Sequence, residues 1–288
     1  MSADPFVARV ARDLVVVGGA DATSFLQSLV SQDLAPVGVG EAVPALLLQP
    51  QGKILVAFVA RRADDTTWQC VCEGGFGAVL AAGLERFRIR VDVAIEERAV
   101  AAAAVRGAAA PIAPDVPAGV TLVPVAWAGR PAPGAPAYDA FGTEADVAAF
   151  VAGLGLPVAD GAEYEIARIE AGVPRMGTDL DETTIPQEAG VESDAVSFTK
   201  GCFVGQELVC RIDSRGHVNR HLRRLRAVDR ADGALAGGAA VEADGVPVGT
   251  VTSPGPGVAL AMIRREVEPG TVVVVGGTPV VVETLAPG

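Results

Sequence analysis

Residues 200–211 read Lys-Gly-Cys-Phe-Val-Gly-Gln-Glu-Leu-Val-Cys-Arg, and no other stretch of the sequence carries as much chemical information. Gly201 and Gly205 flank Cys202 and permit a close backbone approach or a positive φ around the thiol. Lys200 is one of only two lysines in a chain with 21 arginines. A neighbouring ammonium group stabilises the thiolate, the form of cysteine that acts as a nucleophile or metal ligand. We interpret Cys202 as a functional thiol; the alternative is a buried, inert cysteine in a tight loop.

The same run resembles the K-G-C-[FY]-x-G-Q-E-x3-[RK] signature of the YgfZ-type folate-binding proteins, which act in iron–sulfur cluster assembly and repair. Every specified position from Lys200 to Arg211 matches this pattern. A second run, residues 168–190, is similar to the R-x-E-x-G…G-x-D…P-x-E pattern of the aminomethyltransferase/YgfZ superfamily. Residues 25–33 resemble the F-L-x-x-L…D segment of the same superfamily, so the resemblance covers nearly the whole chain except residues 96–160.

This resemblance implies an α+β fold in which subdomains surround a central channel and a small β-barrel lies at the C-terminus. We expect residues 1–216 to form the folate-binding region, with subdomains of approximately 1–95 and 96–216. Residues 217–288 then form the barrel. The mixture of short strands and helices along the chain also favours an α+β fold over a doubly wound sheet.

The resemblance also implies a ligand, tetrahydrofolate or a related reduced folate, bound in the channel with Cys202 near its rim. Glu170 corresponds to the glutamate that contacts the pterin ring, and on a helix it lies within the apolar face of Ile166, Ile169 and Val173. From the residues alone, an ordinary amphipathic helix end with Glu170 facing solvent is equally compatible. The other expected folate-binding or loop-forming residues are Lys200, Gln206, Glu207 and Arg211. Asp179 and Glu188 are expected to order a loop through turns and backbone hydrogen bonds.

One position departs from the aminomethyltransferase pattern. These enzymes carry a paired-aspartate run, roughly G-x-x-D-D, and its first aspartate serves the aminomethyl chemistry. The matching stretch here begins at Gly52 and places Leu55 at that aspartate. Leucine cannot accept a proton. We therefore expect no aminomethyltransferase activity and no conventional enzyme.

The composition excludes several other classes of function. The net charge of −12 argues against a general nucleic-acid or anionic-membrane binder. Residues 200–226 are locally basic, with seven Lys/Arg and two acidic residues, and indicate either a solvated segment or a patch for an anionic ligand or acidic partner. No apolar run is long enough to span a bilayer, residues 1–13 lack a signal-peptide core, and four cysteines without a framework fit the cytoplasm.

The spacing of the cysteines and histidines does not match the usual metal sites. Cys70 and Cys72 are expected on one face of a strand, as buried reduced thiols. His217 and His221 would clamp a metal only on a helix, and they fall where the pattern turns to β structure. We predict no permanent metal, with Cys202 as a transient cluster or sulfur ligand at most.

The apolar patterns predict the main elements by residue range. Strands are expected at 14–17, 43–49, 54–60, 68–72, 89–95, 120–127, 222–227, 246–252, 258–263, 271–275 and 280–285, and helices from near 21 and over 76–87, 144–154 and 163–171. Gly276-Gly277 predicts a two-residue hairpin turn. The rest of 101–136, rich in Ala, Pro and Gly, is expected to be a connection or a part of the second subdomain.

Three functions remain open at this stage. The first is a tetrahydrofolate-binding accessory protein that assists iron–sulfur enzymes or cluster-assembly proteins through Cys202. The second is a folate-dependent one-carbon transferase or demethylase. The third is a scaffold that binds client proteins through residues 200–226 without folate.

Overall fold

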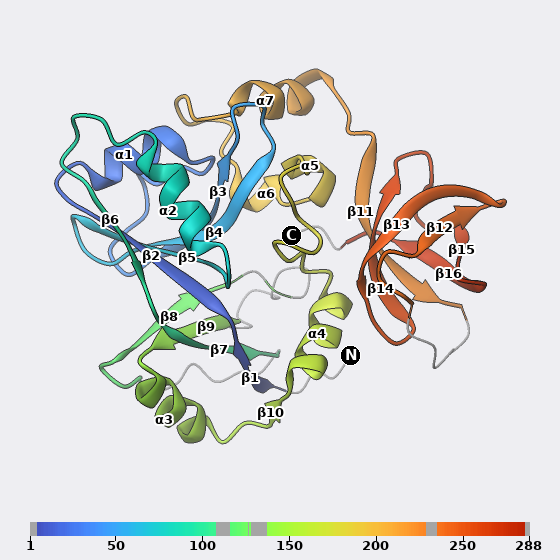
Figure 1. Cartoon of the computed structure of the whole chain (residues 1–288), viewed down its shortest axis with the longest axis horizontal. Coiled ribbons are helices and arrows are strands. Elements are labelled where there is room, and N and C mark those ends of the chain that lie inside the picture. Colours follow the sequence, from blue (N-terminus) through green and yellow to red (C-terminus); the bar gives the residue numbers. More distant parts are fainter. Residues whose placement is uncertain (1–4, 108–115, 126, 128–136, 229–234, 286–288) are drawn as a thin grey trace.

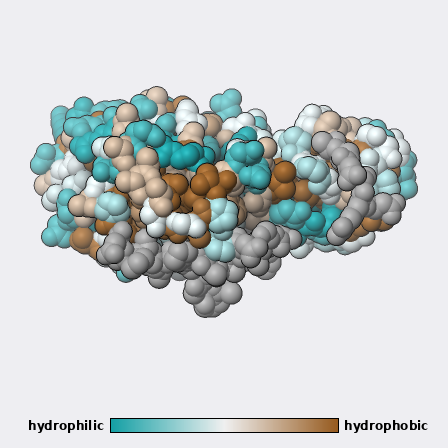
Figure 2. Space-filling model, turned by 90° about the horizontal axis from the view of Figure 1, so that it is seen from below, coloured by the Kyte–Doolittle hydropathy of each residue, from teal (hydrophilic) through white to brown (hydrophobic). Residues whose placement is uncertain are grey.

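The computed structural model describes residues 5–107, 116–125, 127, 137–228 and 235–285. Two five-stranded sheets with flanking helices form the larger part of the molecule, and a closed barrel forms the rest (Figure 1). The expected α+β class and the C-terminal barrel are therefore confirmed. Seen from below, the barrel forms a smaller lobe beside the main body, and apolar residues gather on this face where the two meet (Figure 2).

The first sheet has the strand order β3-β4-β5-β2-β6 and is antiparallel throughout. Its strands are β2 (Arg12–Gly18), β3 (Ala42–Leu48), β4 (Ile54–Arg62), β5 (Thr67–Glu73) and β6 (Ala94–Arg98). Helices α1 (Ala22–Leu29) and α2 (Gly77–Glu85) pack on one face around the buried Trp68. Alternate side chains of β4 are buried, as the period of two in its sequence predicts.

The second sheet has the order β10-β1-β7-β9-β8. Its strands are β1 (Phe6–Val10), β7 (Ala101–Arg106), β8 (Val120–Pro124), β9 (Tyr138–Gly142) and β10 (Val158–Ala159). Thr143 is the N-cap of helix α3 (Glu144–Leu154), and its hydroxyl accepts a hydrogen bond from the backbone N–H of Asp146. Helix α4 (Gly161–Ala171) begins with a capping box between Asp160 and Glu163 and ends at Gly172 in the left-handed region.

The barrel closes in the order β11-β14-β13-β12-β15-β16. Its strands are β11 (Arg220–Ala227), β12 (Ala240–Ala243), β13 (Val246–Pro254), β14 (Val258–Arg264), β15 (Val272–Val275) and β16 (Thr278–Glu283). The predicted hairpin turn at Gly276-Gly277 joins the last two strands, and both glycines have a positive φ. Between α4 and the barrel lie α5 (Pro186–Ala189), α6 (Glu192–Ala195) and α7 (Gln206–Arg215).

The structure differs from the sequence predictions in specific places. The predicted strand at 89–95 begins later, as β6. The N-terminal strand β1 and the alanine-rich β7, which the sequence patterns do not reveal, pair with each other in the second sheet. Of the expected connection 101–136, residues 108–115, 126 and 128–136 lie outside the described residues. Helix α7 was not predicted either. No helix within the described ranges is long and apolar enough to cross a membrane.

The glycines of the turn between β3 and β4 and of the loop before α7 pack against each other. Gly205 has a φ of 77°, and a Cβ there would lie 2.3 Å from the carbonyl oxygen of Gln49 and 3.1 Å from the Cα of Gly52. Gly52 has a φ of 80°, and a Cβ there would lie 2.9 Å from the carbonyl oxygen of Gly205. Only glycine fits at either position without backbone movement.

We expect Gly205→Ala to lower the free energy of unfolding by about 1–3 kcal/mol, because it combines a strained φ with a backbone clash. Gly201→Ala is the matched control in the same loop: Gly201 has no positive φ, and no atom lies within 4 Å of the added Cβ. This control should stay within about 0.5 kcal/mol of the parent. Urea denaturation of both variants measures the difference, and equal stabilities would disprove the packing role of Gly205.

Candidate functional site

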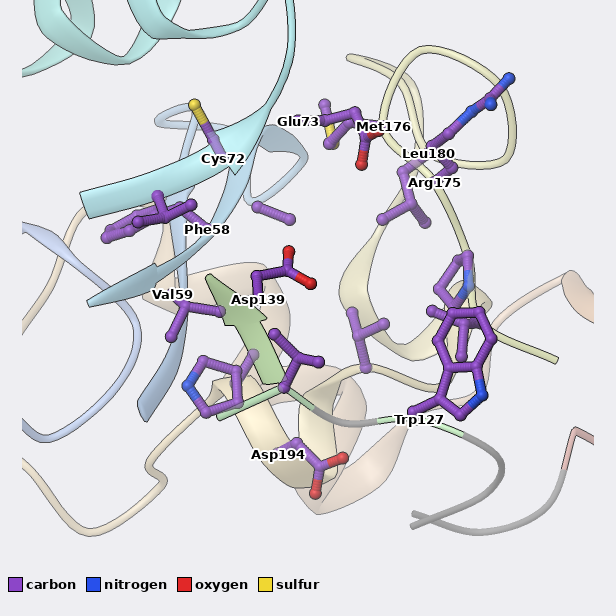
Figure 3. Close-up of a pocket in the computed structure, with 18 of the residues that line it drawn as sticks. Phe58, Val59, Cys72, Glu73, Trp127, Asp139, Arg175, Met176, Leu180 and Asp194 are labelled. Atoms are coloured by element: carbon purple, nitrogen blue, oxygen red, sulfur yellow. The ribbon is translucent and has the colours of Figure 1, made fainter. Parts of the chain in front are cut away.

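A cavity of about 560 Å³ lies where the two sheets meet α4 and the loop that follows it. Its wall from the first sheet includes Phe58 and Val59 of β4, and its opposite wall includes Met176 and Leu180 of the loop (Figure 3). Cavities of about 300–1,000 Å³ with mostly apolar walls and a few polar groups are typical of small-molecule sites. This cavity is therefore the candidate ligand site.

The polar part of the cavity wall is built around Asp139 of β9. Its carboxylate accepts a hydrogen bond from Arg106 Nη2 at 2.5 Å and one from Arg12 Nε at 2.8 Å. The side chains of Asp139 and Arg106 are only 3% and 2% exposed. Burial favours a raised pKa for Asp139, but Arg106 and Arg12 outweigh it and hold this pKa below its ordinary value. Asp139 is thus a fully paired anion.

Glu73, the last residue of β5, lines the same wall and extends toward the centre of the cavity in Figure 3. Arg12 Nη1 donates a hydrogen bond of 2.8 Å to its Oε1. Burial raises the pKa of Glu73 above its ordinary value, although Arg12 lowers it. Arg12 therefore joins two carboxylates, one from each sheet. Burial would lower the pKa of Arg12, but Asp139 and Glu73 raise it overall, so it remains a cation.

Two aromatic side chains complete this part of the wall. The rings of Trp127 and Tyr164 have their centroids 5.5 Å apart and an interplanar angle of 32°. The guanidinium carbon of Arg106 lies 4.7 Å from the centroid of Trp127, a cation–π distance. The cavity therefore offers flat aromatic surfaces next to a charged network, which suits a planar polar ligand.

A second buried network ties the cavity loop to the barrel. Arg168 of α4 donates to Asp179 at 2.9 Å, to Ser253 of β13 at 2.7 Å and to the carbonyl oxygen of Val173 at 2.5 Å. Asp179 also accepts hydrogen bonds from the backbone N–H of Arg175 and from the hydroxyl of Ser253. Asp179 thus orders the loop, as predicted. Glu188 has the predicted kind of role as well, because it accepts the backbone N–H of Ile185 at 3.0 Å.

Glu170, the expected pterin contact, pairs with the barrel in this structure. Its carboxylate accepts hydrogen bonds from Arg226 of β11 at 2.8 and 3.1 Å, and its backbone oxygen accepts one from Arg224 at 2.5 Å. The hydrogen bonds from Arg226 lower the pKa of Glu170. The cavity wall includes its neighbours Arg168 and Ala171 but not Glu170 itself, among the described residues. In this structure Glu170 joins α4 to the barrel, and its expected pterin contact remains a prediction.

Lys200 is held by three backbone oxygens, and its expected role toward Cys202 or folate remains a prediction. Its ammonium group donates hydrogen bonds of 2.7, 2.7 and 2.9 Å to the carbonyl oxygens of Gln27, Val30 and Gln32. These oxygens belong to the C-terminal end of α1 and the turn after it, where a cation is favourable. Burial lowers the pKa of Lys200 to about 8. Its three N–H groups are directed to these oxygens rather than to Cys202 or a ligand in the cavity.

The remaining predicted residues lie in or next to α7. Gln206 accepts a hydrogen bond from the backbone N–H of Phe203 at 3.1 Å and so shapes the loop, as expected. Glu207 and Arg211 are exposed, and Arg211 borders a groove between α7 and the segment that leads to the barrel. None of these three lines the cavity, as far as the described residues show. Their expected contacts with folate remain a prediction.

The four thiols have different surroundings. Cys202 is exposed, whereas Cys70 and Cys72 are buried on one face of β5, as predicted. Burial raises the pKa of Cys72 to about 12 and that of Cys70 further. Cys210 is partly buried, and burial together with Asp213 raises its pKa. Within the described ranges no group of three or more His, Cys, Asp or Glu side chains is arranged to hold a metal ion.

Cys202 does not line the cavity, but the next residue connects it to the cavity wall. Phe203 is 7% exposed and packs with Leu46, Met176 and Leu180, all of which contribute to that wall. The loop is fixed further by a hydrogen bond from the backbone N–H of Val204 to the carbonyl oxygen of Leu29. The thiol therefore stands on a rigid loop, one residue away from the packing that bounds the ligand site.

Leu55, at the position of the missing aspartate, is partly buried against the core of the first sheet. Its Cδ2 atom lies 3.0 Å from the point where a Cβ on Gly83 of α2 would stand. It packs on α2 and is not part of the cavity wall among the residues described.

Sequence reasoning missed the charged residues of the cavity wall. They include Arg12, Glu73, Arg106 and Asp139, together with the aromatic residues Trp127 and Tyr164. The sequence contains a signal for them, because a single charged residue occurs within or at the end of an otherwise apolar strand. Arg106 ends an alanine-rich run, and Asp139 lies in Tyr-Asp-Ala-Phe. A charge in a buried strand requires a buried partner.

Comparison with known proteins gives relatives with three different names. An aminomethyltransferase of Bordetella bronchiseptica is 30% identical over 227 residues, which cover 68% of this chain and 60% of that protein. The tRNA-modifying protein YgfZ of Edwardsiella ictaluri is 28% identical over 230 residues, 73% of this chain and 67% of the relative. An iron-sulfur cluster assembly factor IBA57 homolog of Chaetomium globosum is 36% identical over 94 residues, 32% of this chain and 21% of that protein.

The fold has a solved counterpart. The glycine cleavage system aminomethyltransferase T from Bartonella henselae superposes with a TM-score of 0.84 at 20% identity, over 99% of this chain and 86% of that one. No model of a protein family matches the sequence. The chain spans about 60% of the length of the aminomethyltransferase relative. Together with the fold, these relatives show that the chain belongs to the YgfZ-type, aminomethyltransferase-like superfamily.

Proposed function

We propose that this protein binds a reduced folate in the cavity between its two sheets and assists iron–sulfur cluster assembly or repair through Cys202. The observation that carries the proposal is the pairing of this cavity with an exposed thiol on a fixed loop that packs against the cavity wall. The partners would be iron–sulfur enzymes or cluster-assembly proteins in the cytoplasm.

The cavity supports the folate part of the proposal through its shape and chemistry. Its volume of about 560 Å³ is in the range of small-molecule sites. The aromatic rings of Trp127 and Tyr164 provide surfaces for a flat ring system, and Glu73 provides a carboxylate for its N–H groups. An aminomethyltransferase and a YgfZ protein among the relatives agree with a folate ligand.

The thiol supports the iron–sulfur part. Cys202 is the exposed cysteine of the four, whereas burial raises the pKa of Cys70, Cys72 and Cys210 and keeps those thiols protonated. The relative named as an iron-sulfur cluster assembly factor agrees with this assignment. A single exposed sulfur suits a transient contact with a cluster or a sulfur carrier better than a resident metal, which needs several ligands.

A folate-dependent aminomethyl transferase is the second candidate, favoured by the aminomethyltransferase relatives. The reaction needs an acid/base group at the folate. The position that carries it in those enzymes is Leu55 here, and Asp139 is held as an anion by two arginines. The third candidate, a scaffold without folate, gives the cavity no role.

Titration calorimetry with 5-formyltetrahydrofolate should show saturable binding at one site per chain. p-Aminobenzoylglutamate, which lacks the pterin, is the matched ligand and should bind at least tenfold more weakly, because the aromatic and charged wall then has no ring to hold. Absence of heat from the complete folate would leave the scaffold as the better description.

We expect no glycine cleavage when this protein is the sole aminomethyl-transferring component of a reconstituted system. The physical reason is the leucine at position 55, which cannot exchange a proton. An authentic aminomethyltransferase in the same mixture serves as the positive control. Formation of methylenetetrahydrofolate above background would establish the second candidate.

Cys202→Ser should abolish rescue of iron–sulfur enzyme activity in a strain lacking this gene, while folate affinity and the unfolding midpoint remain unchanged. The reason is that the side chain is exposed and its loss creates little cavity. Cys210→Ser is the control and should rescue normally.

The same thiol should be modified first by iodoacetamide at neutral pH, with Cys70 and Cys72 modified last, as followed by mass spectrometry. Full rescue by Cys202→Ser would show that the loop has a structural role only.

A further inference from the structure

A second hollow, with a volume of about 490 Å³, lies where α7 meets α5 and the segment that leads into β11 (Figure 1). Its apolar walls come from Leu208 and Ile212 of α7, from Ile185 before α5 and from Val218 before β11. Among the described residues, none lines both this hollow and the cavity between the sheets. We refer to it as the α7 groove.

Helix α7 presents apolar side chains on two sides. Leu208, Arg211 and Ile212 share one side of the helix, because residues three and four apart lie on the same face. Val209 lies on a different side and is fully buried in the core. Leu208 and Ile212 are only partly buried, and both line the groove. The core therefore covers one apolar side of α7, and the other side forms the wall of the groove.

The charge left unpaired on the rim of the groove is positive. Arg211 and His217 line the rim and are exposed, and neither side chain has a hydrogen bond or ion pair with any residue that the structure describes. Glu188, a carboxylate of the groove, is already bound by Arg220 at 3.0 and 3.2 Å. Glu207 lies one turn before Arg211 on α7, but it is not part of the groove wall in the described ranges.

A second unpaired arginine lies at the barrel end of the groove. Arg264 of β14 is directly opposite Arg220 of β11, and the backbone N–H of Arg265 donates to the carbonyl oxygen of Asn219, which lines the groove. Like charges on directly opposite residues are unfavourable. Glu188 offsets the charge of Arg220, but the exposed Arg264 forms no ion pair within the described part of the chain. Arg264 therefore lacks a carboxylate, as Arg211 does.

We propose that the α7 groove is the docking site for an acidic polypeptide segment of the protein that meets Cys202. An apolar side chain of this segment occupies the groove beside Leu208 and Ile212, and its carboxylates pair with Arg211 and Arg264. The loop that carries Cys202 leads directly into α7, so a partner seated along this helix lies next to the exposed thiol. The inference rests on the proposed function and names the chemistry of its partner.

A nucleic acid is the competing anionic partner. Proteins that bind nucleic acids carry a basic face with several cations, and those that bind single strands add aromatic side chains for stacking. This chain has a net charge of −12, and no aromatic side chain lines the groove among the described residues. An apolar floor with a polar rim is the arrangement of protein–protein interfaces. The composition of the groove therefore favours a polypeptide.

The direct test is fluorescence anisotropy of the full chain with three short fluorescein-labelled peptides. The first alternates glutamate with leucine, the second has serine in place of leucine, and the third has lysine in place of glutamate. We expect the parent to bind the first peptide at least tenfold more tightly than either control peptide, because only the first supplies both the apolar side chains and the carboxylates. Absence of saturable binding of the first peptide, or affinity no greater than for either control, would overturn the inference.

Variants of the two arginines locate the binding. Arg211→Glu and Arg264→Glu should each weaken binding of the glutamate–leucine peptide at least fivefold, with an unchanged unfolding midpoint because neither arginine has an ion pair to lose. Arg211→Lys keeps the charge and should keep most of the affinity. Arg86→Glu is the matched control, since Arg86 is exposed at the end of α2 and also has no ion pair among the described residues. An equal loss in Arg86→Glu would show an effect of net charge alone and contradict the assignment.

A labelled single-stranded oligonucleotide of mixed sequence tests the competing partner. We expect it to bind the parent more weakly than the glutamate–leucine peptide does, and equally well to the parent and Arg211→Glu. Tighter binding of the oligonucleotide that is lost in Arg211→Glu would replace the polypeptide by a nucleic acid.

Rescue of the deletion strain separates this inference from the proposed function. The double variant Arg211→Glu/Arg264→Glu should lower rescue of iron–sulfur enzyme activity, while its folate affinity and the alkylation of Cys202 by iodoacetamide stay at the level of the parent. Arg86→Glu should rescue normally. Full rescue by the double variant would refute the docking site and leave the proposed function intact. Full rescue by Cys202→Ser, or absence of folate binding to the parent, would instead refute the proposed function, whatever the peptides bind.

Discussion

The buried carboxylate of Asp139, held between Arg12 and Arg106, is the constraint on which the arrangement of the two sheets depends. Arg12 begins a strand of the first sheet, whereas Arg106 and Asp139 lie on neighbouring strands of the second. Taking these charges out of water is costly, and the cost is offset only while all partners remain in place. Removal of one partner from such a group typically costs about 3–5 kcal/mol, because it leaves an unpaired buried charge. The two sheets are therefore held in one relative position, and the cavity wall is fixed with them.

The barrel is joined to this frame through α4, which carries contacts on two sides. Arg168 links the cavity loop to Ser253 of the barrel, and Glu170 pairs with Arg226 on another barrel strand. Arg168 and Glu170 lie in the same turn of α4 as Ala171, and Ala171 and Gly172 line the cavity. Arg168 and Glu170 of the R-x-E-x-G run thus connect α4 to the barrel, and Arg168, Ala171 and Gly172 also line the cavity. The motif therefore marks the region of the cavity, although the carboxylate of Glu170 pairs with the barrel.

The sequence predicts the apolar strands of the first sheet and the barrel because their side chains alternate or form short Val- and Leu-rich runs. The sequence does not predict β7, because its four consecutive alanines show no alternation of polar and apolar side chains. It does not predict α7 either, because this helix begins after a glycine in the left-handed region and is mostly polar. The fold and its superfamily nevertheless follow from the motif around Cys202. The roles of Lys200 and Glu170 do not, since each is decided by a partner far away in the sequence: the end of α1 for one and β11 for the other. Local patterns show that a side chain is unusual but not which way it points.

The residues around Cys202 are best understood as a support for one sulfur atom. Lys200 fastens the loop to α1, Gly205 lets it approach the turn at Gly52, and Gln206 closes it onto Phe203. Each of these side chains or backbone positions is used in packing or hydrogen bonding, and Cys202 between them is left exposed. The loop therefore combines a fixed position with an open face at the thiol. Phe203, the residue after Cys202, belongs to the same apolar cluster as Leu46, Met176 and Leu180 of the cavity wall, so the loop that holds the thiol and the wall of the cavity share one structural element.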